Sequence, residues 1–163
     1  ESLDSLERFI ALYPGSKKIS YAYYLRALNY FEQIKDVERD QSMTEKAKQA
    51  FYEVTTKYPD SQFAQDALDK IDIINDRLAA KEMEIARYYQ FDHQWISAIN
   101  RYNDILENFK TSVYTAESLH RLVEIYYSLG LYEEAKRYAA TLGHNFPDSK
   151  WYVMSYKIIE DII

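Results

Sequence analysis

Three histidines, His93, His120 and His144, are the side chains of this chain best suited to bind a metal ion. A zinc site on a helix needs two imidazoles about one turn apart, and these three lie much farther apart along the chain. The chain also has no cysteine, which excludes thiolate chemistry, disulfides and sulfur-ligated metals. We therefore predict no metal site and structural roles for the histidines.

Two pairs of adjacent carboxylates are the remaining candidates for acid–base chemistry. Glu133 and Glu134 begin a predicted helix, where the helix dipole favours negative charge, and Glu160 and Asp161 fit a solvated helix face. Neither a Gly-x-Ser-x-Gly elbow nor a Gly-x-x-x-x-Gly-Lys phosphate loop occurs in the sequence. The sequence thus predicts neither an enzyme nor a bound cofactor.

Tyrosine is the residue type that stands out, because 17 of the 163 residues are tyrosines. A tyrosine ring stacks on apolar groups while its hydroxyl forms a hydrogen bond with a peptide backbone. Most of these rings are expected to fill the space between helices. Four of them, on the first helices of predicted helix pairs, are expected to face the inner curve of the array partly and to form a peptide-binding groove: Tyr21, Tyr23, Tyr24 and Tyr127.

Charge and hydropathy exclude several classes of partner. A net charge of −6 argues against nucleic acid and against an anionic bilayer surface. No apolar run reaches the roughly 18 residues of a membrane span, and the amino end does not resemble a signal peptide. Because the chain begins at Glu1, already within a helical pattern, we expect a fragment or a processed form whose targeting signals lie outside it.

A recurring tetrad separates the elements that must position these side chains. Proline cannot continue a helix and keeps the preceding residue out of the α region, and the serine can cap the following helix. Three copies keep the proline and a fourth lacks it: Tyr13-Pro14-Gly15-Ser16, Tyr58-Pro59-Asp60-Ser61, Phe146-Pro147-Asp148-Ser149 and Phe109-Lys110-Thr111-Ser112. The spacings exceed the roughly 34 residues of a tetratricopeptide (TPR) repeat, so the unit is a lengthened one.

An all-α fold follows from apolar residues that recur at three and four positions and from the scarcity of glycine and proline. The segment 119–147 resembles a TPR unit, with two apolar stripes on either side of Gly130, and His93 takes the place of Gly130 in the preceding unit. We predict one TPR-like array, a right-handed α-α superhelix of antiparallel helix pairs. Its predicted parts are the second helix of a truncated repeat (1–14), a repeat with a loop insertion at 35–42 (17–59), two further repeats (61–110 and 112–147) and the opening helix of another (149–163).

One predicted helix is unusually long. Between Ser61 and Phe91 there is no proline or glycine, and apolar or small residues are spaced by three, four or seven. This spacing predicts a single helix over 62–91, about 45 Å long at 1.5 Å per residue. Since a repeat buries its apolar stripe only against its neighbours, we expect so long a helix to need a further partner surface, such as another protein.

The stretch KYPDSQFAQDALDKIDIINDRLAAKEMEIARYYQ (57–90), which leads into WISAINRYNDILENF (95–109), resembles the BamD family of outer-membrane assembly lipoproteins. The tetrads and the insertion at 35–42 share this resemblance, which runs from about Leu3 to Phe146. It implies a non-catalytic protein-interaction scaffold of the β-barrel assembly machinery, at the periplasmic face of the bacterial outer membrane. The lipid-bearing cysteine of the family would lie outside this chain, as would its amino-terminal repeats.

The resemblance also implies the partners. They are the periplasmic POTRA domains of the barrel-forming subunit, accessory lipoproteins and unfolded outer-membrane proteins. Arg101, in the stretch INRYND, matches a family arginine that contacts the barrel subunit, and a guanidinium can form a two-pronged pair with a carboxylate. The alternative for Arg101 is a surface pair with Asp104 of its own helix.

Two other functions remain open at the level of the sequence. A periplasmic TPR coordinator of cell-envelope, peptidoglycan or division processes would share the tetrads without requiring the long helix. A TPR-regulated enzyme would need a catalytic domain outside these residues. The full-length reading frame separates the three: a Leu-x-x-Cys lipobox favours the assembly lipoprotein, a coiled-coil amino region favours the coordinator and a fused catalytic domain favours the enzyme.

Overall fold

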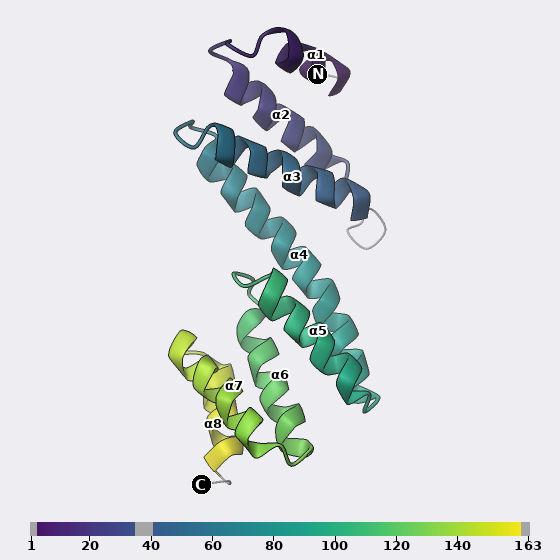
Figure 1. Ribbon diagram of the computed structural model, residues 1–163, viewed down its shortest axis with the longest axis vertical. Coiled ribbons are helices and arrows are strands. Elements are labelled where there is room, and N and C mark those ends of the chain that lie inside the picture. The colour runs from purple at the N-terminus through teal and green to yellow at the C-terminus, as the bar shows by residue number, and fades with distance from the viewer. Residues whose placement is uncertain (1–2, 35–40, 161–163) are drawn as a thin grey trace. The chain divides into compact units, whose positions relative to one another are not determined.

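A computed structural model of the chain describes residues 3–34 and 41–160. Every regular element in these two ranges is an α-helix, which confirms the predicted all-α fold. In chain order the helices are α1 (Leu3–Leu12), α2 (Ile19–Glu32), α3 (Gln41–Lys57), α4 (Ala64–Phe91), α5 (Trp95–Asn108), α6 (Thr115–Ser128), α7 (Tyr132–Asn145) and α8 (Lys150–Glu160) (Figure 1).

Helices that follow one another in the chain pack against each other, α2 against α3 and α6 against α7, as in a TPR-like fold. The predicted long helix is present as α4. It begins at Ala64 rather than at residue 62, because the preceding residues form a turn in which the Ala64 N–H donates to the Ser61 carbonyl. Of the predicted insertion, residues 35–40 lie outside the described residues, and Gln41 and Ser42 already belong to α3.

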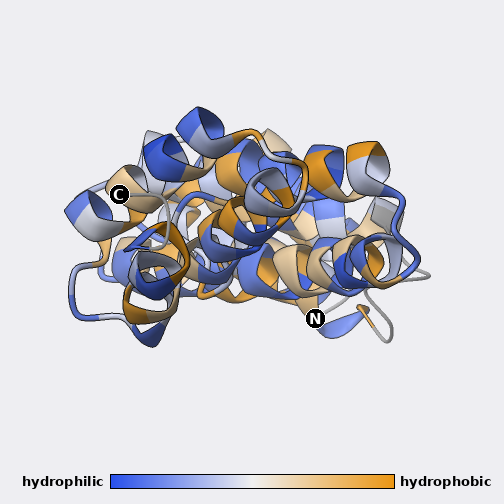
Figure 2. Cartoon of the chain, turned by 90° about the horizontal axis from the view of Figure 1, so that it is seen from below, coloured by the Kyte–Doolittle hydropathy of each residue, from blue (hydrophilic) through white to orange (hydrophobic). Residues whose placement is uncertain are grey.

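The chain divides into two compact units, unit 1 (Glu1–Arg77) and unit 2 (Leu78–Ile163), and α4 contributes to both. In unit 1 the core lies between α2, α3 and the first part of α4. Its buried side chains include Ala27, Phe51, Val54 and Ile74, and the Phe51 ring meets Phe31 edge-on at 6.0 Å. Hydrophobic and hydrophilic residues lie on different sides of the helices, as amphipathic packing requires (Figure 2).

The core of unit 2 brings three helices together. Its fully or almost fully buried side chains come from the second part of α4, from α5 and from α6: Ala79, Met83, Ala86, Ala98, Tyr102, Ile105, Leu122 and Ile125. A second cluster joins Val123 of α6 to Ala135 and Ala139 of α7, with Ile158 and Ile159 of α8 packed against it. The small side chains of Ala135 and Ala139 allow α6 and α7 to approach each other closely.

All four tetrads form the same backbone turn. In each, the serine N–H donates to the carbonyl of the aromatic residue, as from Ser16 to Tyr13 at 3.0 Å and from Ser149 to Phe146 at 3.1 Å. Only Ser149 lies directly before its helix, and its Oγ accepts the Tyr152 N–H at 3.1 Å. After the other three serines a short turn intervenes before the helix begins. The tetrad therefore marks the end of one helix more exactly than the start of the next.

The turns after α4 and α6 are also alike. His93 and Gly130 both have positive φ angles, 58° and 74°. In both turns the next residue donates back to the last helical turn, from Gln94 to Tyr89 and from Leu131 to Tyr126, each at 2.9 Å. His93 thus adopts the left-handed conformation of Gly130, which costs a residue with a side chain about 1–2 kcal/mol.

Candidate partner-binding surfaces

Within the described ranges no group of three or more metal-ligating side chains is placed to hold an ion. None of the described helices has the length and apolar character needed to cross a bilayer. The predicted site residues lie on α2 in unit 1 and on α5 and α6 in unit 2.

Tyr23 of α2 lies among cations. The Arg26 guanidinium is 4.8 Å and the Lys57 ammonium 4.7 Å from its ring centre, and Lys57 Nζ also donates to the Tyr23 hydroxyl at 3.2 Å. This hydrogen bond is the main cause that raises the pKa of Lys57. The half-buried Tyr23 thereby joins α2 to the end of α3, where its ring also lies 5.3 Å from that of Tyr58.

Tyr24 is engaged within the protein on both its ring and its hydroxyl. The ring stacks on Phe63 at 5.0 Å, and the hydroxyl donates to a carboxylate oxygen of Asp66 on α4. Burial is the largest cause and this hydrogen bond the next largest cause that raise the pKa of Tyr24 to about 12. Tyr24 therefore supports the packing of α2 against α4 in unit 1.

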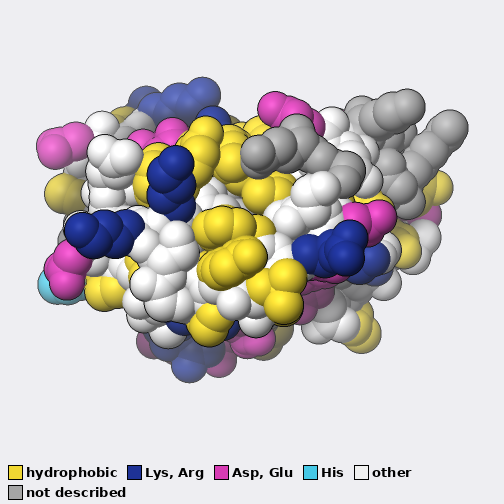
Figure 3. All heavy atoms as spheres, turned by 90° about the horizontal axis from the view of Figure 1, so that it is seen from above, with side chains coloured by type: hydrophobic (Ala, Val, Ile, Leu, Met, Phe, Trp, Pro, Cys, Tyr) yellow, Lys and Arg dark blue, Asp and Glu magenta, His cyan; other side chains and the backbone are white. Residues whose placement is uncertain are grey.

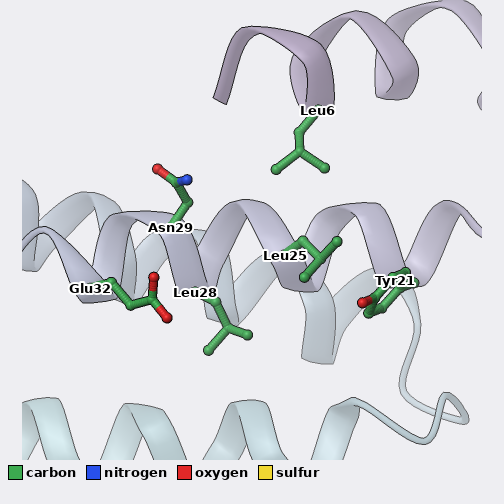
Figure 4. A pocket seen from close by; sticks show the side chains of 6 residues that line it. All are labelled: Leu6, Tyr21, Leu25, Leu28, Asn29 and Glu32. Atoms are coloured by element: carbon green, nitrogen blue, oxygen red, sulfur yellow. The ribbon is translucent and has the colours of Figure 1, made fainter. Parts of the chain in front are cut away.

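Tyr21 is the exposed tyrosine of α2, and it lies on a groove between α1 and α2 (Figure 4). One part of this groove, a cavity of about 330 Å³, is lined by Leu6 of α1 and by Tyr21, Leu25, Leu28, Asn29 and Glu32 of α2. Leu6 points from α1 toward α2, as the close-up shows. Hydrophobic side chains also gather over α1 and α2 in the space-filling view, between groups of Lys and Arg (Figure 3).

Tyr127 belongs to unit 2 and is half-buried, with its ring 5.5 Å from that of Tyr132. It lies on a cavity of about 530 Å³ to which α4, α6 and α8 contribute side chains: Gln90, Arg121, Glu124, Tyr127, Ser128, Lys157 and Ile158. The three tyrosines of α2 are thus close to one another in unit 1, whereas Tyr127 has a separate surface.

A network of ion pairs beside this cavity was not predicted from the sequence. Glu117 of α6 is almost fully buried and accepts two hydrogen bonds from Arg87 of α4, at 3.1 and 2.7 Å. Arg121 bridges Glu117, at 3.2 Å, and Glu124, at 2.9 Å. The spacing of Glu117, Arg121 and Glu124 along α6 is a signal for helical ion pairs. Nothing in the sequence, however, identifies Arg87 as the partner.

His120 is completely buried at the other end of the network. Its Nδ1 lies 2.8 Å from the Ser155 hydroxyl of α8. Its Nε2 faces Glu124 at 3.3 Å, at ion-pair distance but without the alignment of a hydrogen bond. The ring is 5.3 Å from that of Trp151. These contacts give His120 a role in the packing of α8 on α6, in keeping with the structural role predicted for it.

Glu124 gives unit 2 an expected sensitivity to acid. Burial alone would raise the pKa of Glu124, but the His120 imidazole and the Arg121 guanidinium outweigh burial and lower the pKa to about 2. Since the folded pKa lies below the ordinary value of 4.5, the stabilisation is fully present above that pH and is lost as pH falls toward 2. Its size is about 3 kcal/mol.

Urea unfolding across this acid range measures the contribution of Glu124 to the stability of unit 2. The Glu124→Gln variant is expected to be less stable than the parent at neutral pH and to lose less stability on acidification. Parallel loss of stability by the parent and the variant would contradict the role given to Glu124.

Arg101 lies on α5 and forms an ion pair with a residue of α4. Its Nη1 donates to Glu82 Oε2 of α4 at 2.7 Å, and this hydrogen bond is the main cause that raises the pKa of Arg101. Asp104 of the same helix, the alternative partner considered from the sequence, makes a smaller, Coulombic contribution that also raises the pKa of Arg101. The Arg101 side chain is still 38% exposed, so part of the guanidinium is open to a partner.

A family of outer membrane lipoproteins, YfiO, matches residues 1–142, which include Arg101 and all four predicted tyrosines. The chain belongs to this family. The YfiO match confirms the resemblance inferred from the stretch 57–109.

Relatives of this chain carry the name outer membrane protein assembly factor BamD. The protein of Caulobacter vibrioides is 48% identical over 161 residues, which are 99% of this chain and 53% of the relative. That of Rickettsia prowazekii is 45% identical over 161 residues, 99% of this chain and 64% of the relative. That of Neisseria meningitidis serogroup A is 33% identical over 159 residues, 91% of this chain and 60% of the relative. The chain thus spans between about half and two thirds of these relatives.

The YfiO match ends before α8. The contacts of His120 and Arg121 with α8, made through Ser155 and Trp151, therefore lie partly beyond it. The ion pairs of Arg87 with Glu117 and of Arg101 with Glu82 lie entirely inside it. The Caulobacter vibrioides and Rickettsia prowazekii relatives extend the similarity to 99% of this chain.

Proposed function

We propose that this chain is the protein-binding part of an outer-membrane protein assembly factor, a non-catalytic scaffold at the periplasmic face of the bacterial outer membrane. The observation that carries the proposal is membership of the YfiO family together with 48% and 45% identity to two proteins named as BamD. The proposed partners are the POTRA domains of the barrel-forming subunit, accessory lipoproteins and unfolded outer-membrane proteins.

The packing of the described residues supports a scaffold. The packed helices expose side chains in both units. The four predicted tyrosines differ in how accessible they are to a partner. We assign direct contact to Tyr21 on the α1–α2 groove and to Tyr127 on the cavity of unit 2. Tyr23 and Tyr24 contribute by holding α2 in place, since their rings and hydroxyls already have partners.

We assign Arg101 to the contact with the barrel-forming subunit. The ion pair with Glu82 orients the side chain and uses one terminal nitrogen of the guanidinium. A planar guanidinium has five N–H donors, so Arg101 can keep Glu82 and still donate to a partner carboxylate. Glu82 then acts as the positioning residue for Arg101.

Reversal of charge at this position tests the assignment. Arg101→Glu is expected to weaken binding of the chain to the POTRA module by more than about tenfold, because it replaces an attraction by a repulsion. Arg101→Gln, which does not place two carboxylates side by side at Glu82, is expected to show a smaller loss in the same direction. Titration calorimetry with the soluble POTRA module measures both.

Arg137→Glu is the matched control, because Arg137 is 69% exposed on α7 and also belongs to unit 2. Circular dichroism melts establish that the variants remain folded. Unchanged POTRA binding by Arg101→Glu, or an equal loss in Arg137→Glu, would rule out the specific role of Arg101.

A further inference from the structure

In unit 1, residues that follow the tetrad 13–16 and residues at the end of and just after the tetrad 58–61 line one pocket. The turn at 13–16 is followed by two lysines and the start of α2, and the turn at 58–61 leads into α4. The cavity has a volume of about 610 Å³ and is lined by Lys17, Lys18, Ser20, Tyr21, Ser61, Gln62 and Phe63. The rings of Tyr21 and Phe63 lie 5.2 Å apart and form one apolar side of it.

The charge of this pocket is opposite to that of the chain. Its only charged lining residues are Lys17 and Lys18, although the net charge of the protein is −6. Both lysines are exposed, and neither forms an ion pair with another residue in the described ranges. Two adjacent ammonium groups without a carboxylate between them make a local positive potential that attracts anions.

Ser61 differs from the serines of the other three tetrads. Its Oγ is buried and has no hydrogen-bond partner among the described residues. The serines of the other three tetrads accept backbone N–H groups: Ser16 from Lys18, Ser112 from Tyr114 and Ser149 from Tyr152. A buried hydroxyl without a partner is unfavourable, because nothing compensates the loss of its hydration.

We propose that this pocket binds a carboxylate side chain of a partner protein, with an adjacent apolar side chain of the same partner on the Tyr21 and Phe63 rings. The two lysine ammonium groups supply the donors for the carboxylate. The ring pair favours a protein over a bare anion or a lipid headgroup, because a phosphate makes no use of an apolar wall. The inference rests on the proposed role of the chain as a protein-binding scaffold.

Two blocked peptides test the site. One is a capped hexapeptide in which Glu and Asp alternate with Phe, and the other has Gln and Asn at the acidic positions. Fluorescence anisotropy with the whole chain is expected to show about tenfold tighter binding of the acidic peptide at low salt, and a smaller difference at high salt. Because both ends are blocked, a terminal carboxylate cannot supply the effect.

The variant Lys17→Gln/Lys18→Gln is expected to bind the two peptides equally. The matched control Lys46→Gln/Lys110→Gln removes the same charge from exposed positions that do not line the pocket and is expected to keep the preference. Tyr21→Leu is expected to weaken both peptides to a similar degree, since it removes a ring and no charge.

Equal binding of the two peptides by the parent chain, or an unchanged preference in Lys17→Gln/Lys18→Gln, would overturn the proposal. Lysine-dependent binding to vesicles of phosphatidylglycerol and phosphatidylcholine, without any peptide preference, would assign the pocket to a membrane surface and also overturn it. POTRA binding measured on the same preparations separates the two ideas. If the parent chain binds POTRA but does not prefer the acidic peptide, only the carboxylate-binding role of the pocket is refuted. If it prefers the acidic peptide but does not bind POTRA, only the proposed binding to the barrel-forming subunit is refuted.

Discussion

Replacement of Glu117 by alanine is expected to lower the free energy of unfolding of unit 2 by about 3 kcal/mol. Glu117 is 7% exposed and is the common carboxylate of Arg87 and Arg121, which approach it from α4 and from α6. Without it, Arg87 loses both of its hydrogen bonds to Glu117, and Arg121 keeps its pair with Glu124. Removal of one partner of a partly buried network costs stability, because the guanidinium groups that remain have lost part of their compensation.

Urea unfolding followed by circular dichroism measures the loss. Glu133→Ala is the matched control, since Glu133 is 85% exposed and only loosely paired with Lys136 at 3.5 Å. Its expected change is below about 0.5 kcal/mol, as for an exposed pair. In the double variant Glu117→Ala/Arg87→Ala part of the lost stability should return. A Glu117→Ala variant as stable as the parent would show that the network contributes little to folding.

A loss of about 3–5 kcal/mol is also expected when Tyr102 is replaced by alanine. Tyr102 is completely buried in the core cluster of α4, α5 and α6, and its hydroxyl donates to Gln90 Oε1 at 2.7 Å. The substitution removes a large ring from a closely packed region and leaves Gln90 without this donor. Burial is the main cause that raises the pKa of Tyr102.

Tyr102→Phe separates the two contributions, because it keeps the ring and removes the hydroxyl, with an expected loss of about 1 kcal/mol. Thermal and urea unfolding of both variants, with the exposed Tyr88→Ala as control, checks the expectation. If Tyr102→Ala lost no more than Tyr88→Ala, the side chain could not be part of the core. If Tyr102→Phe lost as much as Tyr102→Ala, the hydroxyl and not the ring would dominate.

Arg101 illustrates how far sequence reasoning reaches into the site. The resemblance to a family points to this residue, and its position on a helix after Trp95 follows from local pattern. The identity of its ion-pair partner does not follow from the local pattern. Asp104 is near in sequence, but Glu82 on the neighbouring helix is the residue that Arg101 contacts. The choice between them depends on how α4 and α5 are rotated about their axes, and no local rule specifies that rotation.

The four tyrosines show the same limit. Helical periodicity places Tyr21, Tyr23 and Tyr24 on one predicted helix, and α2 contains them. Neighbouring positions on a helix point in different directions, however, and the surroundings decide what each ring does. Tyr24 meets Phe63 and Asp66, Tyr23 meets two cations, and Tyr21 remains exposed on a groove.

The sequence alone determined the all-α class, the presence of one long helix, α4, and the chain turns at the tetrads, and its resemblance to a known family indicated the family. The first three features depend on interactions between residues a few positions apart: apolar spacing along a helix, the missing N–H of proline and the backbone restriction before it. Only the tertiary structure decided that Glu117 lies between Arg87 and Arg121, and that residues next to two tetrads line one pocket with two lysines. Such contacts join residues from different helices, and they exist only after packing has set the separation and rotation of those helices.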